Sequence, residues 1–140
     1  MSDLVNSTDL ALLILRVGTG VIFVPHGYPK MTGGGGDKKG GQAHLAQSVA
    51  QMGLPFPLAF AILVGAVEFF GGAMLVLGLQ TQLAALALVF VMLVATGRVL
   101  VQREFVGEAD FPFSLLVATL ALALLGGGAA SLDQVLLAAK

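Results

Sequence analysis

Four apolar runs dominate the sequence, and each is long enough to cross a lipid bilayer. They cover residues 10–28, 56–79, 83–101 and 111–128. A membrane-spanning helix needs about 20 apolar residues at a rise of ~1.5 Å each. Membrane-spanning strands would instead alternate apolar and polar residues over about 10 positions, and runs such as AALALVFVMLVA do not alternate. The runs therefore predict four transmembrane helices.

The composition and the lengths of the connections predict how these helices are arranged. Of the 140 residues, 57% are hydrophobic and 11% are charged, and the mean hydropathy of +0.95 is typical of an integral membrane protein. We expect an all-α fold, a single domain over residues 1–140 that forms an antiparallel up-and-down bundle of four transmembrane helices. The glycine-rich stretch of residues 31–41 is interpreted as a flexible loop. Residues 42–52 follow it as a short amphipathic segment that could lie on the membrane surface.

The basic residues predict the orientation in the membrane. Those near the first and third connections are Lys30, Lys38, Lys39, Arg98 and Arg103, whereas the opposite side offers only Lys140. The positive-inside rule then places both termini outside and the loops of residues 29–55 and 102–110 in the cytoplasm. We therefore expect a multi-pass protein of the cell membrane.

Charge and cysteine content exclude several classes of function. A net charge of −1 is incompatible with the basic patch that nucleic-acid binding requires. The sequence has no cysteine, so it can form neither a disulfide nor a thiolate-ligated metal site. His26 and His44 are not expected at one depth, as two haem ligands would have to be. We expect no metal site and no covalently bound cofactor.

Arg16 and Glu68 are the clearest charged residues inside the predicted spans, where a charge costs ~2.5–3.5 kcal/mol on insertion scales. If the first helix starts at residue 10 and the second ends at residue 79, Arg16 lies about 9 Å and Glu68 about 16 Å below the same surface. The glycines that would let their helices approach closely are Gly20, Gly27, Gly65 and Gly72. We predict that the two side chains form an intramembrane ion pair. The pair would either hold the helices together or line a polar pocket for a quinone head group or a proton path.

Other polar residues gather near the ends of the spans. Those expected at the inner boundary are His26, Lys30, Arg98, Glu104 and Glu108. They form either a site where the two inner loops converge or simply a solvated charged rim. At the outer end, Asp133 is a candidate acidic site residue or a cap of the short segment that follows it, for which Ser131 is the better N-cap. No catalytic residue is assigned.

Several segments in order resemble the DoxX family of small four-helix membrane proteins. They are RVGTGVIFVPHGYPK in the first span, GLP before the second, VGAVEFFGGAMLVLGLQT within it, and GGGAASLD after the fourth. The last departs from the family pattern, in which we expect a proline among the glycines. The resemblance implies roles for Arg16, His26, Lys30, Glu68 and Asp133, and for an acidic residue before the fourth helix, which is Glu108 or Asp110.

The same resemblance implies two alternative functions. DoxX-like proteins include subunits of thiosulfate:quinone oxidoreductases and partners of soluble redox enzymes. We expect an accessory or anchoring subunit of a larger membrane redox complex, with the lipid bilayer and other membrane or redox subunits as partners. The alternative is a quinone-binding subunit of such an oxidoreductase, in which quinone and lipid would be the bound molecules. A transporter is disfavoured because the sequence lacks inverted repeats with broken helices.

Overall fold

A computed structural model describes residues 6–34, 40–102 and 105–138 of the chain. The elements, in order, are α1 Ser7–Thr32, α2 Gln42–Gln51, α3 Pro57–Leu77, α4 Thr81–Gln102, the short kinked segment η1 Phe105–Ala109, α5 Asp110–Leu125 and α6 Leu132–Ala138. Four helical stretches are long and apolar enough to cross a membrane: Ser7–Thr32, Pro57–Leu77, Thr81–Val101 and Phe105–Leu125. The predicted all-α fold with four membrane-spanning helices is confirmed.

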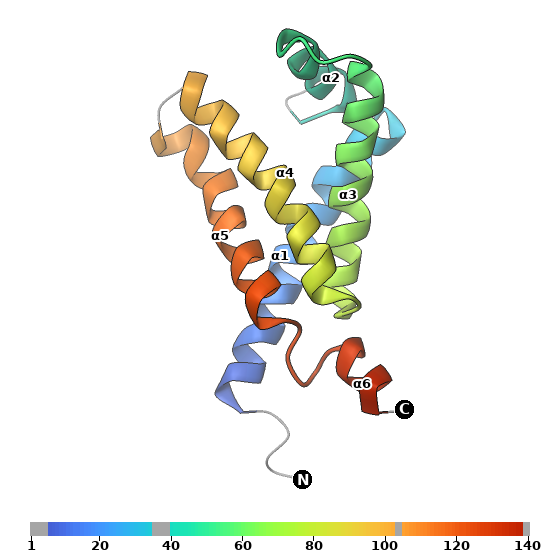
Figure 1. Cartoon of the computed structure of the whole chain (residues 1–140), viewed down its shortest axis with the longest axis vertical. Coiled ribbons are helices and arrows are strands. Elements are labelled where there is room, and N and C mark those ends of the chain that lie inside the picture. The colour runs from blue at the N-terminus through green and yellow to red at the C-terminus, as the bar shows by residue number, and fades with distance from the viewer. Residues whose placement is uncertain (1–5, 35–39, 103–104, 139–140) are drawn as a thin grey trace.

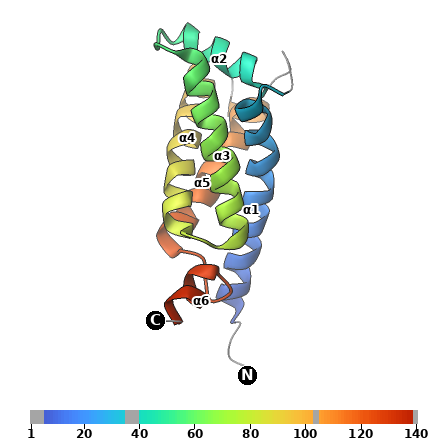
Figure 2. The same cartoon turned by 90° about the vertical axis from the view of Figure 1, so that its right-hand side faces the viewer.

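The long helices α1, α3, α4 and α5 run up and down along one axis (Figures 1 and 2). The most extensive contacts are those of α1 with α3 and of α4 with α5, and α3 also contacts α4. The short helix α2 lies at one end of the bundle, and α6 lies at the other, together with the first turn of α1 (Figure 1). We call these the α2 end and the terminal end.

The first helix is longer than its apolar run. The side chain of Asn6 accepts a hydrogen bond from the Asp9 amide (2.9 Å) and so caps the start of α1. At its other end α1 continues to Thr32 through Pro25 and Pro29. Proline is tolerated in membrane-spanning helices because other groups bind the carbonyls that it frees. Consequently α1 begins three residues before, and ends four residues after, the predicted span of 10–28.

The α1–α3 contact is built on glycine, as the sequence predicts. A Cβ atom on Gly20 would lie 2.5 Å from the carbonyl oxygen of Gly72, and one on Gly65 would lie 2.6 Å from the Met31 amide nitrogen. Real Cβ atoms do not approach backbone atoms so closely. The two helix backbones are therefore in direct contact, and only glycine fits between them.

The centre of the bundle is an apolar core. Its buried members are Leu12, Phe23, Leu75, Ala84, Ala85, Leu88, Met92, Leu115 and Leu122. Many other large apolar side chains on these helices point outward and are exposed, including Ile14, Phe90 and Leu124. In a chain of four spans, such side chains face lipid or neighbouring subunits.

The segment between the first two spans is partly ordered helix. The predicted amphipathic segment is helix α2, which buries Ser48 and Val49 and packs on α3 and, less extensively, on α1. One side of α2 therefore covers the end of the bundle, and the other side is exposed (Figure 2). Of the predicted flexible loop, residues 35–39, with Lys38 and Lys39, lie outside the described residues.

Candidate functional site

Glu68 forms a buried ion pair with Lys30 near the α2 end. The ammonium Nζ of Lys30 donates to Oε2 of Glu68 at 2.5 Å. The Glu68 side chain is 3% exposed and the Lys30 side chain 13% exposed. The pair joins the last turns of α1 to the middle of α3, beside the glycine contact at Gly65. The charge of Glu68 is thus neutralised inside the bundle.

The predicted ion pair between Arg16 and Glu68 is therefore wrong. The helices touch, but their register places Arg16 beside Gly78, just after the end of α3. Glu68 lies ten residues before Gly78, which is about 15 Å along a helix axis. The prediction assumed that the ends of α1 and α3 are level. Instead α1 extends beyond α3, and its first turns contact the segment of residues 128–130.

Backbone carbonyl groups surround Arg16 in place of a carboxylate. The residue is 1% exposed, and its guanidinium donates to the carbonyl of Ala130 through Nη2 (2.9 Å) and to that of Val76 through Nη1 (3.4 Å). Val76 lies in the last turn of α3, where unpaired carbonyls and the helix dipole favour a cation. A Cβ atom on Gly78 would collide with the guanidinium. Arg16 therefore caps the end of α3 and ties it to the segment before α6.

Asp133, in α6, caps the start of α4. Its carboxylate accepts hydrogen bonds from the backbone amides of Gln80 (2.6 Å) and Thr81 (2.9 Å), where α4 begins, and its own amide donates to the Gly78 carbonyl (2.9 Å). Burial raises the pKa of this carboxyl, but the two amides and the nearby charge of Arg16 outweigh that effect and hold its pKa below the ordinary value. Asp133 and Arg16 together fix the α3–α4 turn.

Ser131 caps α6 as the sequence predicts. Its hydroxyl accepts from the Gln134 amide (3.4 Å) and donates to the Gly128 carbonyl (2.7 Å). The prediction that Asp133 caps the segment that contains it is wrong, because its carboxylate caps α4.

The predicted inner-boundary cluster is only partly brought together. Lys30 is paired with Glu68, while His26 is exposed, with Nδ1 donating to the Ile22 carbonyl (2.8 Å) and its ring 5.9 Å from that of Phe111. Nε of Arg98 is buried and has no hydrogen-bond partner among the described residues.

The remaining acidic residues of this end lie just before α5 or at its first residue. Glu108 is exposed in η1, and Glu104, like Arg103, lies outside the described residues. Asp110 accepts from the amides of Gly107 (3.0 Å) and Phe111 (2.8 Å) and so stabilises the start of α5. Over the described part of the chain, no group of three or more His, Cys, Asp or Glu side chains could hold a metal ion.

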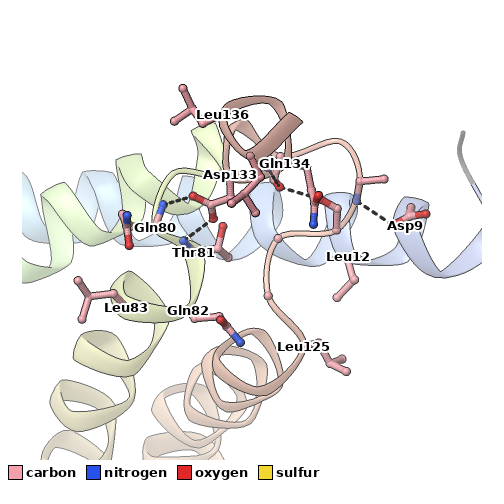
Figure 3. Close-up of a pocket in the computed structure, with 16 residues that line it drawn as sticks. Asp9, Leu12, Gln80, Thr81, Gln82, Leu83, Leu125, Asp133, Gln134 and Leu136 are labelled. Carbon is pink, nitrogen blue, oxygen red and sulfur yellow. Dashed lines mark hydrogen bonds between the residues drawn. The ribbon is translucent and has the colours of Figure 1, made fainter. Parts of the chain in front are cut away.

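A pocket at the terminal end was not predicted from the sequence. It is an open cavity of about 880 Å³ between the α3–α4 turn, the end of α5, the segment of residues 126–129 and α6 (Figure 3). Asp9 lines it from α1 and accepts a hydrogen bond from the Ala129 amide through Oδ1 (2.8 Å). The glycine run GGG at residues 126–128 was the available signal, because glycine permits the positive φ angles that Gly126 and Gly128 adopt there.

Comparison with known proteins identifies the family. The model of the DoxX family matches residues 11–103. "Putative oxidoreductase CatD" of Bacillus subtilis (strain 168) is 32% identical over 128 residues, which cover 91% of this chain and 88% of that protein. "Inner membrane protein YphA" of Escherichia coli (strain K12) is 31% identical over 143 aligned positions, which cover 94% of each chain. No solved structure matches. This chain is a member of the DoxX family.

Proposed function

We propose that this protein is an accessory subunit of a larger membrane redox complex, in which it anchors or completes a partner that carries the electrons. The name of CatD, which describes an oxidoreductase, supports the redox part of this proposal. The accessory role is supported by the two buried charged side chains, Glu68 and Arg16, because both are bound by other groups of this chain. Glu68 is neutralised by Lys30, and Arg16 is bound by two backbone carbonyls.

Groups used in this way stabilise the bundle and are not free to react. The sequence has no cysteine, so no thiol of this chain can be oxidised or hold an iron–sulfur cluster. The exposed apolar side chains on the outer helix faces fit lipid and the apolar surface of a second membrane subunit. The electron-carrying group then belongs to the partner.

The orientation is part of the proposal. The α2 end faces the cytoplasm, because most basic residues of the sequence follow the first and third spans, which both end on that side. A soluble partner that exchanges electrons with cytoplasmic substrates would meet this protein at the α2 end.

Co-purification tests the accessory role. The tagged full chain is extracted from its own membrane in mild non-ionic detergent, and the mass of the particle is measured. We expect the mass of the particle to be much larger than that of one 14.3 kDa chain in a detergent micelle. The particle should also contain a second subunit that carries a flavin, haem or iron–sulfur centre. Recovery of the chain alone or as a homo-oligomer, from cells in which all other genes are at native levels, would contradict the proposal.

A quinone-binding subunit is the second candidate, and the unpartnered Nε of Arg98 favours it. A buried N–H without a partner is unfavourable by about 1–3 kcal/mol, and a quinone carbonyl would accept its hydrogen bond. The ring of Phe111 beside His26 offers an aromatic surface at the same end of the bundle. These groups could hold a quinone head while the partner reduces it.

Quinone analysis of the same extract tests this candidate. We expect quinone at about one molecule per chain, and its loss in an Arg98→Gln variant. The control is Gln80→Ala, which changes an exposed side chain at the terminal end and should leave quinone content unchanged. Equal quinone content in Arg98→Gln and in the unaltered protein would exclude a role for Arg98.

A further inference from the structure

We propose that the pocket at the terminal end binds the head of a membrane lipid that carries a primary ammonium group. The pocket lies where three membrane-spanning stretches end or begin, since it is lined by residues of the α3–α4 turn and by Leu125 and Gly126 at the end of α5. Residues at such positions lie at the level of the lipid head groups. A lipid of the surrounding leaflet can therefore reach the pocket without leaving the membrane.

The lining of the pocket is amphipathic. Leucines at its lower rim, Leu83 on α4 and Leu125 on α5, continue onto the exposed apolar surfaces of these helices. Polar side chains of Thr81, Asp9 and Asp133 lie nearer the segment before α6 (Figure 3). A ligand that matches both parts has a polar head and a hydrocarbon chain.

The polar part of the pocket favours a head that donates hydrogen bonds. Oδ1 of Asp9 is bound by the Ala129 amide, whereas Oδ2 of Asp9 accepts no hydrogen bond from the residues described. Thr81 is fully buried at the pocket wall, where its hydroxyl interacts with the Asp133 carboxylate, and its oxygen accepts no hydrogen bond within the described ranges. An ammonium carries three N–H donors, which these oxygens can accept.

The charges of the pocket disfavour an anionic head. Asp133 and Asp9 both contribute carboxylates, and no lysine or arginine is among the residues that line it. Arg16 lies behind the pocket wall, where it is bound by carbonyl groups and is offset by Asp133. A cationic amine is attracted by Asp9, and an anionic head without an amine is repelled.

Lipid titration tests the proposal. The full chain in non-ionic detergent is titrated with phosphatidylethanolamine and with phosphatidylglycerol of the same acyl chains, and bound lipid is counted by native mass spectrometry. We expect phosphatidylethanolamine to bind about tenfold more tightly, as one or two charge-assisted hydrogen bonds would give. Equal affinity for the two lipids would overturn the proposal.

Three variants show whether this preference belongs to the pocket. Asp9→Asn keeps an oxygen for the Ala129 amide but removes the charge, and Thr81→Val keeps the shape of the side chain but removes the hydroxyl. Each should weaken phosphatidylethanolamine binding about fivefold. The matched control is Asp110→Asn, which removes a carboxylate at the α2 end, where asparagine can still cap α5. If Asp9→Asn and Thr81→Val behave as the control does, the site is elsewhere.

A competition arm separates a lipid from a free amine. Soluble ethanolamine has the same ammonium group without the hydrocarbon chain. We expect it to displace the lipid only at concentrations at least about a hundredfold higher, because burial of the hydrocarbon chain adds to the affinity of the lipid and not to that of the free amine. Displacement at equal concentration would assign the pocket to a free amine and overturn the lipid assignment.

Discussion

The ammonium of Lys30 lies 2.5 Å from the carboxylate of Glu68 in a part of the bundle with little access to water. Removing one partner leaves an uncompensated buried charge, which typically destabilises a protein by ~3–5 kcal/mol. We expect Glu68→Leu and Lys30→Met each to destabilise the bundle by about this amount and the double variant to recover most of it. Reversible unfolding in mixed detergent micelles, followed by circular dichroism, measures the difference.

Arg16 supplies the control for this pair. Because Arg16 and Glu68 lie about 15 Å apart along the helix axes, substitutions at the two positions should not compensate each other. The double variant Arg16→Leu, Glu68→Leu should be destabilised by the sum of the single effects, within ~0.5 kcal/mol. The pairing predicted from the sequence would be correct after all if stability recovered in this double variant and did not recover in the double variant Lys30→Met, Glu68→Leu.

Asp133 predicts a dependence of stability on pH. Since its pKa is lower in the folded protein than in the unfolded chain, the carboxylate stabilises the fold above the unfolded pKa of about 3.9. That stabilisation is lost as the pH falls through the still lower folded pKa. The difference in unfolding free energy between the unaltered protein and Asp133→Asn should be constant from neutral pH to about pH 5 and should shrink below about pH 4. An unchanged difference at pH 3 would contradict the cap.

At the scale of the helices, the contact of α1 with α3 depends on the absence of Cβ atoms. A Cβ atom on Gly27 would lie 2.6 Å from the Gly65 carbonyl oxygen and even closer to the Phe69 amide. We expect Gly27→Ala to destabilise the bundle by about 1–3 kcal/mol, as overpacking does. Gly18→Ala on the same helix is the control, because nothing lies within 4 Å of its Cβ position. That variant should be neutral or up to ~1 kcal/mol more stable, and the thermal unfolding of both in one detergent tests the comparison.

At the scale of the whole molecule, four spans place α2 and the α3–α4 turn on opposite sides of the membrane. The natural chain has no cysteine, so His44→Cys on α2 and Gln80→Cys in the turn each introduce a single thiol at an exposed position. A membrane-impermeant maleimide should label His44→Cys only from the cytoplasmic side and Gln80→Cys only from the outside. Labelling of both from one side would be incompatible with this topology, and the reverse pattern would invert the proposed orientation.

The sequence predicts this architecture well because transmembrane helices are defined by the length of apolar runs. It also predicts the glycine contact between α1 and α3, because small residues recur at helical spacing. It does not predict the partner of Glu68, because that depends on the axial register of two helices, and neighbouring helices need not end at the same level. The role of Asp133 and the pocket at the terminal end depend on where residues 126–134 turn back, which apolar patterns do not specify.

The carbonyl of Ala130 that binds Arg16 belongs to a residue 114 positions later in the chain. A ribosome adds about 5–20 residues per second, so α1 enters the membrane roughly 10 s before this partner is made. During that time the guanidinium must remain near the head groups or in the protein channel through which the chain inserts. The bundle therefore closes around its first helix only after the segment before α6 has been synthesised.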